Sequence, residues 1–193
     1  MALAEPVAND ADTAHAAGPS VYAWGLNNYG QLAHHGLDPA PPRIPRDPTD
    51  DNYNSGVPEP VEMPSLPAGR APPRVRGIGA AFYNTFVLMN GRGALCAGSN
   101  QAGQCGTAAG THTGLKPIPE LANTNVSRIL GGYCHTLALT EDGKVVTLGC
   151  GEDGQRGDGR PMDTEDWSGL TEVDTGGDKI SQIAAGANHV SPV

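Results

Sequence analysis

One short stretch of sequence occurs three times in this chain. The copies are VYAWGLNNYGQLA from Val21, ALCAGSNQAGQCG from Ala94 and VVTLGCGEDGQRG from Val145. Each begins with apolar residues, continues through a glycine and a polar loop, and reaches a Gly-Gln pair. The copies start 73 and 51 residues apart (94 − 21 and 145 − 94). Such recurrence indicates a repeat architecture, in which similar units stack on one another.

A second motif precedes the first motif in two of the units. VSRILGGYCHTLAL from Val126 aligns with VRGIGAAFYNTFVL from Val75, again 51 residues earlier, and ISQIAAGANHV from Ile180 repeats its first half. His135–Thr140 shows the alternation that is typical of a half-buried strand. Asp142-Gly143 then gives a strong hairpin signal before the β-branched run KVVTL. Each unit is therefore expected to hold antiparallel strands with almost no helix.

Strands are expected where apolar or β-branched residues cluster between glycine-rich turns. A content of 27 glycines and 17 prolines also favours short strands over helices. The expected strands lie near residues 75–79, 84–89, 94–97, 127–131, 135–140, 145–148 and 180–184, with fourth strands around Pro117–Leu121 and Gly169–Val173.

Glycine, glutamine and histidine recur at equivalent positions of the units. Recurring glycine indicates positive φ or a close approach of two backbones. A histidine at equivalent positions of two units, His135 and His189, indicates a structural imidazole bonded to the backbone, because a catalytic residue is needed only once. The positions assigned a structural role are Gly25, Gln31, Gly98, Gln104, Gly132, His135, Gly149, Gln155 and His189.

The pattern resembles the regulator of chromosome condensation repeat family. That family combines an Ile-x-x-Gly-x-x-His-Thr-Leu-Ala-Leu strand, Asp-Gly, a strand ending in Trp-Gly, and Asn-x-x-Gly-Gln-Leu-Gly. Residues 129–143 and 24–32 carry the match, and the resemblance covers about residues 20–36 and 57–193. It implies an all-β fold, a β-propeller of four-stranded blades, present here as a partial propeller of about three of seven blades.

The units depart from the family pattern at several positions. Asn84 stands where histidine is usual, and Ala81 stands where glycine is usual. Ala97 and Leu148 replace the tryptophan, and Arg156 replaces the leucine that follows the glutamine. The repeats are thus degenerate, as in the exchange-factor branch of the family, which the stretch LGCGEDGQ resembles.

The chain divides into a tail and one repeat region. Residues 1–20 are Ala-rich and acidic, lack the parts of a secretory signal, and are predicted to be a disordered tail. Residues 21–193 are expected to form the partial propeller. Its Pro-rich insert, residues 37–74, holds eleven of the 17 prolines and is expected to be a surface loop, with a polyproline ligand as the alternative.

The strands at the two ends of the repeat region have incomplete sets of neighbours. No partner strand of the same unit comes before Val21–Trp24, and only a few residues follow Ile180–His189. Unpaired strand edges and uncovered apolar side chains favour association with other chains. The chain is therefore expected to be a fragment, the product of a truncated gene model, or a chain that pairs with another, and it is expected to bind a hydrophobic dye.

Charge and motif searches exclude several classes of function. A net charge of −9 argues against direct binding of nucleic acid, and the lack of a long apolar run argues against a membrane span. Gly149–Gly154 fits the glycine pattern of a dinucleotide site, but no helix start follows it, so no cofactor is expected. No catalytic set or metal site can be assembled, and no enzyme of covalent chemistry is expected.

The four cysteines show no CxxC pair. Cys96 and Cys150 lie in or beside equivalent strands, where a small apolar residue suits a core. Buried thiols are the expected state, and a disulfide or zinc site is the alternative for Cys96, Cys105, Cys134 and Cys150.

Function is therefore expected from surface loops. The resemblance implies a protein-interaction propeller similar to a guanine-nucleotide exchange factor for a small Ran-type GTPase, which binds through loops of one face. The alternative is a general protein-binding scaffold of the ubiquitin-ligase or signalling type. A nuclear or cytoplasmic location is expected, without secretion. The residues that match the family's contact loops are Tyr83, Asn84, Tyr133, Cys134 and Asn188.

Overall fold

The computed structural model describes residues 21–33, 55–64, 74–90, 93–106, 110–160 and 169–193. The expected tail, residues 1–20, and much of the Pro-rich insert lie outside the described residues. The described chain consists of strands and one short 3₁₀ turn, which confirms the all-β class. The elements are β1 Tyr22–Gly25, β2 Ser55–Pro60, β3 Val75–Ala80, β4 Asn84–Met89, β5 Ala94–Ser99, β6 Thr111–Pro117, η1 Pro119–Leu121, β7 Val126–Gly131, β8 His135–Thr140, β9 Val145–Gly149, β10 Thr171–Glu172, β11 Ile183–Ala185 and β12 Val190–Pro192.

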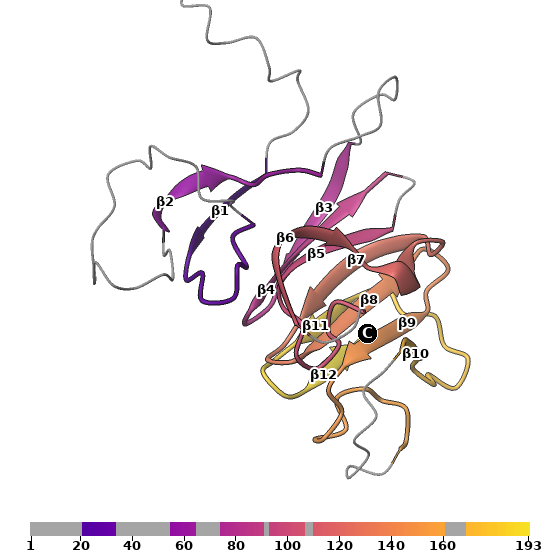
Figure 1. Ribbon diagram of the computed structural model, residues 1–193. Coiled ribbons are helices and arrows are strands. Elements are labelled where there is room, and N and C mark those ends of the chain that lie inside the picture. The colour runs from indigo at the N-terminus through magenta and orange to yellow at the C-terminus, as the bar shows by residue number, and fades with distance from the viewer. Residues whose placement is uncertain (1–20, 34–54, 65–73, 91–92, 107–109, 161–168) are drawn as a thin grey trace, which may run out of the picture.

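The strands form four antiparallel sheets, which we call blades (Figure 1). The first blade is β1-β2, and the fourth is β11-β12. The second blade has the order β3-β4-β5-β6, and the third has the order β10-β9-β8-β7. Each four-stranded blade is a meander in which strands adjacent in sequence pair. The two complete blades therefore repeat one topology, as the recurring motifs predict.

The hydrophobic core lies between the blades. Phe86 and Ile118 of the second blade pack with Ile129 and Leu148 of the third, and all four side chains are almost fully buried. A second cluster joins the first and second blades, and a third joins the third and fourth. Burial of such side chains contributes about 1.5–3 kcal/mol each, so neighbouring blades stabilise one another.

The hairpin between β8 and β9 follows the sequence prediction. Leu137 lies opposite Thr147, and the chain reverses at Asp142-Gly143, where Gly143 has a φ of +86°. Thr140 donates through Oγ1 to Oδ1 of Asp142. That hydrogen bond is the main cause that lowers the pKa of Asp142 below its ordinary value. The turn residues thus fix the register of the two most buried strands of the third blade.

Two expectations about the edge strands are wrong. The Pro-rich insert is expected from its sequence to be a loop, but its residues 55–60 form β2, where Tyr22 lies opposite Pro60. Proline is tolerated there because β2 has a partner on one side only. The fourth strand of the second blade is Thr111–Pro117, and Pro119–Leu121 is instead η1. Pro119 lacks an amide hydrogen for a sheet ladder, and it suits the first turn of a helix.

Candidate functional site

Alternate loops of a meander lie at the same end of its strands. The loops after β3, β7 and β11 therefore share one end of the blades with the loops after β1, β5 and β9. We call this the aromatic end, and the other the opposite end. Of the predicted contact residues, Tyr83, Tyr133, Cys134 and Asn188 lie in loops at the aromatic end, and Asn84 begins β4.

Four aromatic side chains from three blades meet at this end. We call Tyr29, Phe82, Tyr83 and Tyr133 the aromatic cluster. The ring of Tyr83 lies 4.7 Å from Tyr29, 4.7 Å from Phe82 and 5.4 Å from Tyr133 between centroids. Phe82 and Tyr133 lie 5.3 Å apart. These spacings suit edge-to-face and tilted ring pairs, which stabilise a cluster beyond the area that it buries.

The cluster is open to solvent at two of its rings. Phe82 is 58% exposed and Tyr133 is 47% exposed, whereas Tyr83 is half-buried between its neighbours. Burial, and then the hydrogen bond and charge of Tyr133, raise the pKa of Tyr83 above its ordinary value. The phenol of Tyr83 therefore stays neutral at physiological pH.

Backbone hydrogen bonds hold the cluster loops to neighbouring blades. The amide of Phe82 donates to the carbonyl of Gly132 at 3.1 Å, and the amide of Tyr133 donates to the carbonyl of Ala187 at 2.8 Å. Each of the two loops is thus tied to the next blade. Such ties reduce the conformational freedom that the loops lose when a partner binds.

Asn84 follows Tyr83 of the aromatic cluster in the chain and is buried. It is 3% exposed, and its Nδ2 donates to the carbonyl of Ser99 at 2.6 Å. Ala81 and Asn84 stand where the third blade has Gly132 and His135. In the second blade the position of the glycine therefore carries a Cβ, and the position of the histidine carries a smaller side chain. The burial of Asn84 removes it from the contact surface expected from the sequence.

His135 packs on glycine and does not bond to the backbone as expected. Its side chain is buried, and neither ring nitrogen has a hydrogen-bond partner among the described residues. A Cβ added to Gly132 would lie 2.3 Å from Cε1 of His135, so the imidazole occupies the space above that glycine. His189 contacts Gly186 in the same way but is exposed. Burial, and then the nearby charge of His189, lower the pKa of His135.

The repeated glutamines form hydrogen bonds within their own loops. Each is buried, and each accepts a hydrogen bond from the backbone amide two residues earlier. The bonds are Tyr29 N to Gln31 Oε1 at 2.8 Å, Ala102 N to Gln104 Oε1 at 3.0 Å and Asp153 N to Gln155 Oε1 at 2.8 Å.

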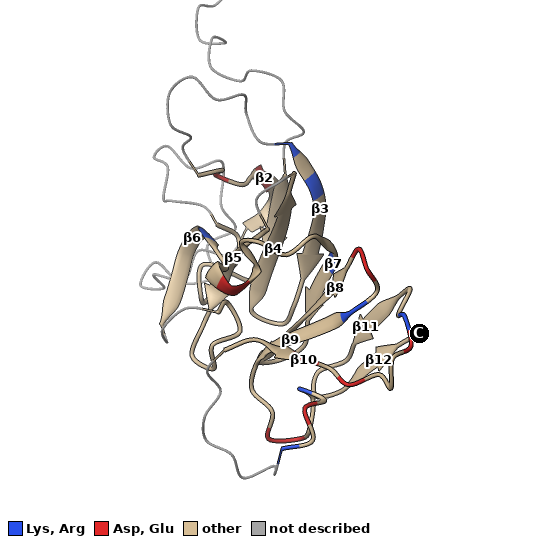
Figure 2. Ribbon diagram, turned by 90° about the vertical axis from the view of Figure 1, so that its right-hand side faces the viewer, with Lys and Arg blue, Asp and Glu red and all other residues tan. Residues whose placement is uncertain are grey.

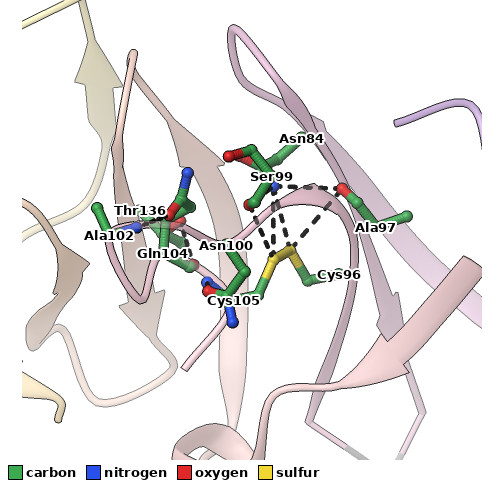
Figure 3. Close-up of a disulfide and its surroundings, with 9 residues drawn as sticks. All are labelled: Asn84, Cys96, Ala97, Ser99, Asn100, Ala102, Gln104, Cys105 and Thr136. Carbon is green, nitrogen blue, oxygen red and sulfur yellow. Dashed lines mark hydrogen bonds between the residues drawn. A yellow bond between two sulfur atoms is a disulfide. The ribbon is translucent and has the colours of Figure 1, made fainter. Parts of the chain in front are cut away.

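The cysteines are paired, so the expectation of free thiols is wrong. Cys96 and Cys105 form one disulfide, with Cα atoms 5.7 Å apart (Figure 3). In the third blade the equivalent positions are Thr147 and Arg156, where Oγ1 of Thr147 donates to the carbonyl of Arg156 at 2.9 Å. The disulfide therefore replaces a hydrogen bond that fastens the loop after the third strand of a blade.

The second disulfide lies at the aromatic end. Cys134 and Cys150 join the loop after β7 to the loop after β9, with Cα atoms 5.6 Å apart. The amide of Cys150 also donates to the carbonyl of Cys134 at 3.0 Å. Tyr133 precedes Cys134, so the disulfide restrains the loop that presents an exposed ring. Cys134 is thus a bonded support, and its thiol is not free for the contact role expected.

Arg156 is buried although the family has an apolar leucine there. Its guanidinium donates to the carbonyls of Gly149 at 3.3 Å and Gly169 at 3.2 Å, and to Oγ1 of Thr171. Its Nε lies 3.2 Å from a carboxylate oxygen of Asp158. A buried guanidinium requires such partners. This side chain therefore fastens the end of a long loop to β9.

An apolar groove adjoins the cluster. It has a volume of about 420 Å³, and its walls include Tyr22, Trp24 and Leu26 of the first blade and Ile78 and Phe82 of the second. Trp24 is 61% exposed and Ile78 is 66% exposed.

Sequence reasoning missed Tyr29 and Phe82 as surface residues. Tyr29 carried one signal, an aromatic where the other copies have Ala102 and Asp153.

The described residues contain no cluster of three or more His, Cys, Asp or Glu side chains that could hold a metal ion. Among the same residues, no helix has the length and apolar character needed to cross a membrane.

Three comparisons with known proteins bear on the family. The model of the regulator of chromosome condensation (RCC1) repeat matches residues 129–155. The ultraviolet-B receptor UVR8 of Arabidopsis thaliana is 26% identical over 178 residues, which cover 91% of this chain and 35% of that protein.

Two solved structures have a similar fold. Human WBSCR16 gives a TM-score of 0.68 at 18% identity, covering 90% of this chain and 44% of that one. Prp20p of Saccharomyces cerevisiae gives a TM-score of 0.64 at 23% identity, and the match covers 90% of this chain and 39% of that one. The chain therefore spans less than half the length of these proteins. Together with the recurring motifs and the blades, these matches show that the chain is an RCC1-type repeat protein with part of a β-propeller.

Proposed function

We propose that this chain is a protein-interaction module that binds its partner through the aromatic cluster. The observation that carries the proposal is the pair of exposed rings, Phe82 and Tyr133, which stand on loops tied to neighbouring blades. Aromatic side chains are enriched among the residues that dominate interface energies. Loops that are already held in place lose little freedom on binding.

A small GTPase of the Ran type is the first partner to test. The structurally similar Prp20p has described binding properties to Gsp1p and to histones. A guanine-nucleotide exchange factor must bind the nucleotide-free GTPase more tightly than the nucleotide-bound form. Such a factor performs no covalent chemistry, in keeping with the lack of a catalytic set in the sequence. A general protein-binding scaffold without exchange activity is the alternative, because the cluster itself does not specify a GTPase.

The test compares binding and exchange in the same variants. Binding of nucleotide-free and nucleotide-bound GTPase is measured by calorimetry, and release of a fluorescent nucleotide is followed over time. The double variant Phe82→Ala, Tyr133→Ala is expected to weaken binding at least about tenfold. Val57→Ala, at an exposed apolar residue of β2, is the matched control. Binding without faster release favours the scaffold, and binding unaffected by the double variant overturns the cluster as the contact surface.

A nuclear or cytoplasmic location is part of this proposal. Those compartments keep most protein thiols reduced. The two disulfides provide a test, because alkylation of thiols at the moment of cell lysis followed by mass spectrometry records their state in the cell. Cys134 and Cys150 recovered as alkylated thiols support the location. Fully oxidised pairs in the recovered chain argue for an oxidising compartment instead.

A further inference from the structure

Basic residues are divided unequally between the two ends of the blades. The described residues include eight lysines and arginines. Six of them lie in loops of the opposite end or in the halves of strands next to it, where Figure 2 shows blue at the start of β3 and near the end of β6. The six are Arg74, Arg76, Lys116, Arg128, Lys144 and Lys179.

The two basic residues on the side of the aromatic end share one carboxylate, that of Asp158. Nε of Arg156 lies 3.2 Å, and Nε of Arg160 3.6 Å, from the same carboxylate oxygen of Asp158. Glu152 and Asp153 are exposed in the loop after β9, and neither has an ion pair with another described residue. These five side chains, two positive and three negative, carry a net charge of −1, and the carboxylates without an ion pair are those of Glu152 and Asp153.

The repeat relates these carboxylates to the cluster. Asp153 occupies the position in its copy of the motif that Tyr29 occupies in the first copy, because both pairs are 124 residues apart (145 − 21 and 153 − 29). Tyr29 packs on Tyr83 of the next blade. Equivalent loops thus present an aromatic ring, Tyr29, in the first unit and a carboxylate, Asp153, two units further along the chain.

We propose that the aromatic end binds a cationic segment of a partner protein, with arginine or lysine side chains against Phe82 and Tyr133 and additional attraction from Glu152 and Asp153. This inference rests on the proposed function and names the chemistry of its partner. The face of an aromatic ring attracts a cation, and the planar guanidinium of arginine stacks on it well. An acidic segment would be repelled by Glu152 and Asp153, and the two cations among the described residues of this end, Arg156 and Arg160, already lie beside Asp158.

The probe is a fluorescently labelled peptide of alternating arginine and serine, with binding measured by anisotropy. Two matched peptides carry citrulline or glutamate in place of arginine. Citrulline keeps the shape of the side chain and removes its charge. The arginine peptide is expected to bind at low salt, more weakly as salt rises, and the other two much more weakly. Equal binding of the citrulline peptide would overturn the inference.

Variants locate the site on the protein. Phe82→Leu with Tyr133→Leu keeps apolar area but removes the π faces, and is expected to weaken arginine-peptide binding between about twofold and fivefold per ring. Glu152→Gln with Asp153→Asn is expected to weaken it and to flatten its salt dependence. The control, Asp174→Asn with Asp178→Asn, changes exposed carboxylates at the opposite end and is expected to leave it unchanged. An equal loss in that control would mean that the peptide binds the negative chain non-specifically, and would overturn the inference.

Failure of this inference is distinct from failure of the proposed function. A protein partner that depends on Phe82 and Tyr133, together with an arginine peptide that does not bind, leaves the interaction module in place and removes the cationic segment. Arginine-peptide binding that depends on both ring and carboxylate pairs supports the inference.

Discussion

The imidazole of His135 lies directly over Gly132, where an added Cβ would come within 2.3 Å of its Cε1. The carbonyl oxygens of Gly186 and Ala187 would lie 2.4 and 2.5 Å from the same Cβ. The absence of a side chain at Gly132 therefore allows two close contacts, one with His135 in the same blade and one with the backbone of Gly186 and Ala187 in the next blade. Glycine and histidine recur together because the ring can occupy this place only when the other residue has no side chain.

Gly132→Ala is expected to destabilise the chain by about 1–3 kcal/mol, the usual cost of inserting atoms into a packed site. Chemical denaturation measures the change. Gly77→Ala is the matched control, because its added Cβ would meet Leu88 Cδ1 at an ordinary 3.5 Å. Equal stability of the two variants would contradict the close packing of the imidazole on Gly132.

Gly149→Val is expected to destabilise by about 1–3 kcal/mol, since a side chain there is forced into strained backbone. Gly149 has a φ of +92°, and its Cβ would lie 2.3 Å from the carbonyl oxygen of Cys134. Gly25 is its repeat equivalent, with a φ of +107° and no atom within 4 Å. Gly25→Val therefore measures the conformational strain alone, and thermal melts of the two variants should rank Gly149→Val as the less stable.

Stability is expected to fall below about pH 6.5 through His135. Burial lowers its pKa from 6.5, so the unfolded chain takes up the proton more readily than the folded chain. The contribution of His135 to stability is fully present above its pKa in the unfolded chain, and it is lost as the pH falls toward its pKa in the folded chain. The slope for one proton is at most about 1.4 kcal/mol per pH unit. Denaturation between pH 7.5 and pH 5.5, as rough limits set by the ordinary histidine pKa, should show it.

His135→Gln is expected to reduce this slope without removing it. Burial also lowers the pKa of His112, which contributes with the same sign. The double variant with His112→Gln should be nearly independent of pH in the same window. A slope that persists in full there would assign the pH dependence to other groups.

Loss of the Cys134–Cys150 disulfide is expected to cost about 2–4 kcal/mol, because the bond restricts the unfolded chain. Cys134→Ala with Cys150→Ala is the variant, and its melting temperature is compared with that of the oxidised parent. Reduction of the parent by a dithiol gives an independent measure. A reduced parent with an unchanged melting temperature would show that the backbone bond between these residues suffices.

The apolar groove between the first and second blades is expected to bind a hydrophobic dye such as ANS and to promote association of the chain. Trp24 and Ile78 expose most of their side chains there. Trp24→Glu with Ile78→Glu should abolish dye binding and lower the apparent mass in sedimentation. A parent chain that sediments as a monomer and binds no dye would contradict this expectation.

The recurring motifs predict the local structure well because strands and turns depend on short-range patterns. The alternation in His135–Thr140 and the Asp142-Gly143 turn lead directly to the β8–β9 hairpin. The recurrence of glycine at the position of Gly149 likewise indicates a positive φ there, because this backbone angle is set by the local turn and not by distant contacts. The meander order of each complete blade follows from short connections between antiparallel strands.

The tertiary structure alone decides which distant residues meet. Spacing in sequence does not reveal that Tyr29 and Tyr83 touch, or that Cys134 and Cys150 pair, because both contacts depend on how loops of different strands come together. The pairing of β2 is equally hidden, because its prolines indicate a loop until an edge position makes them tolerable. Periodicity determines the elements of this chain, whereas the stacking of blades determines which side chains are buried and which form a surface.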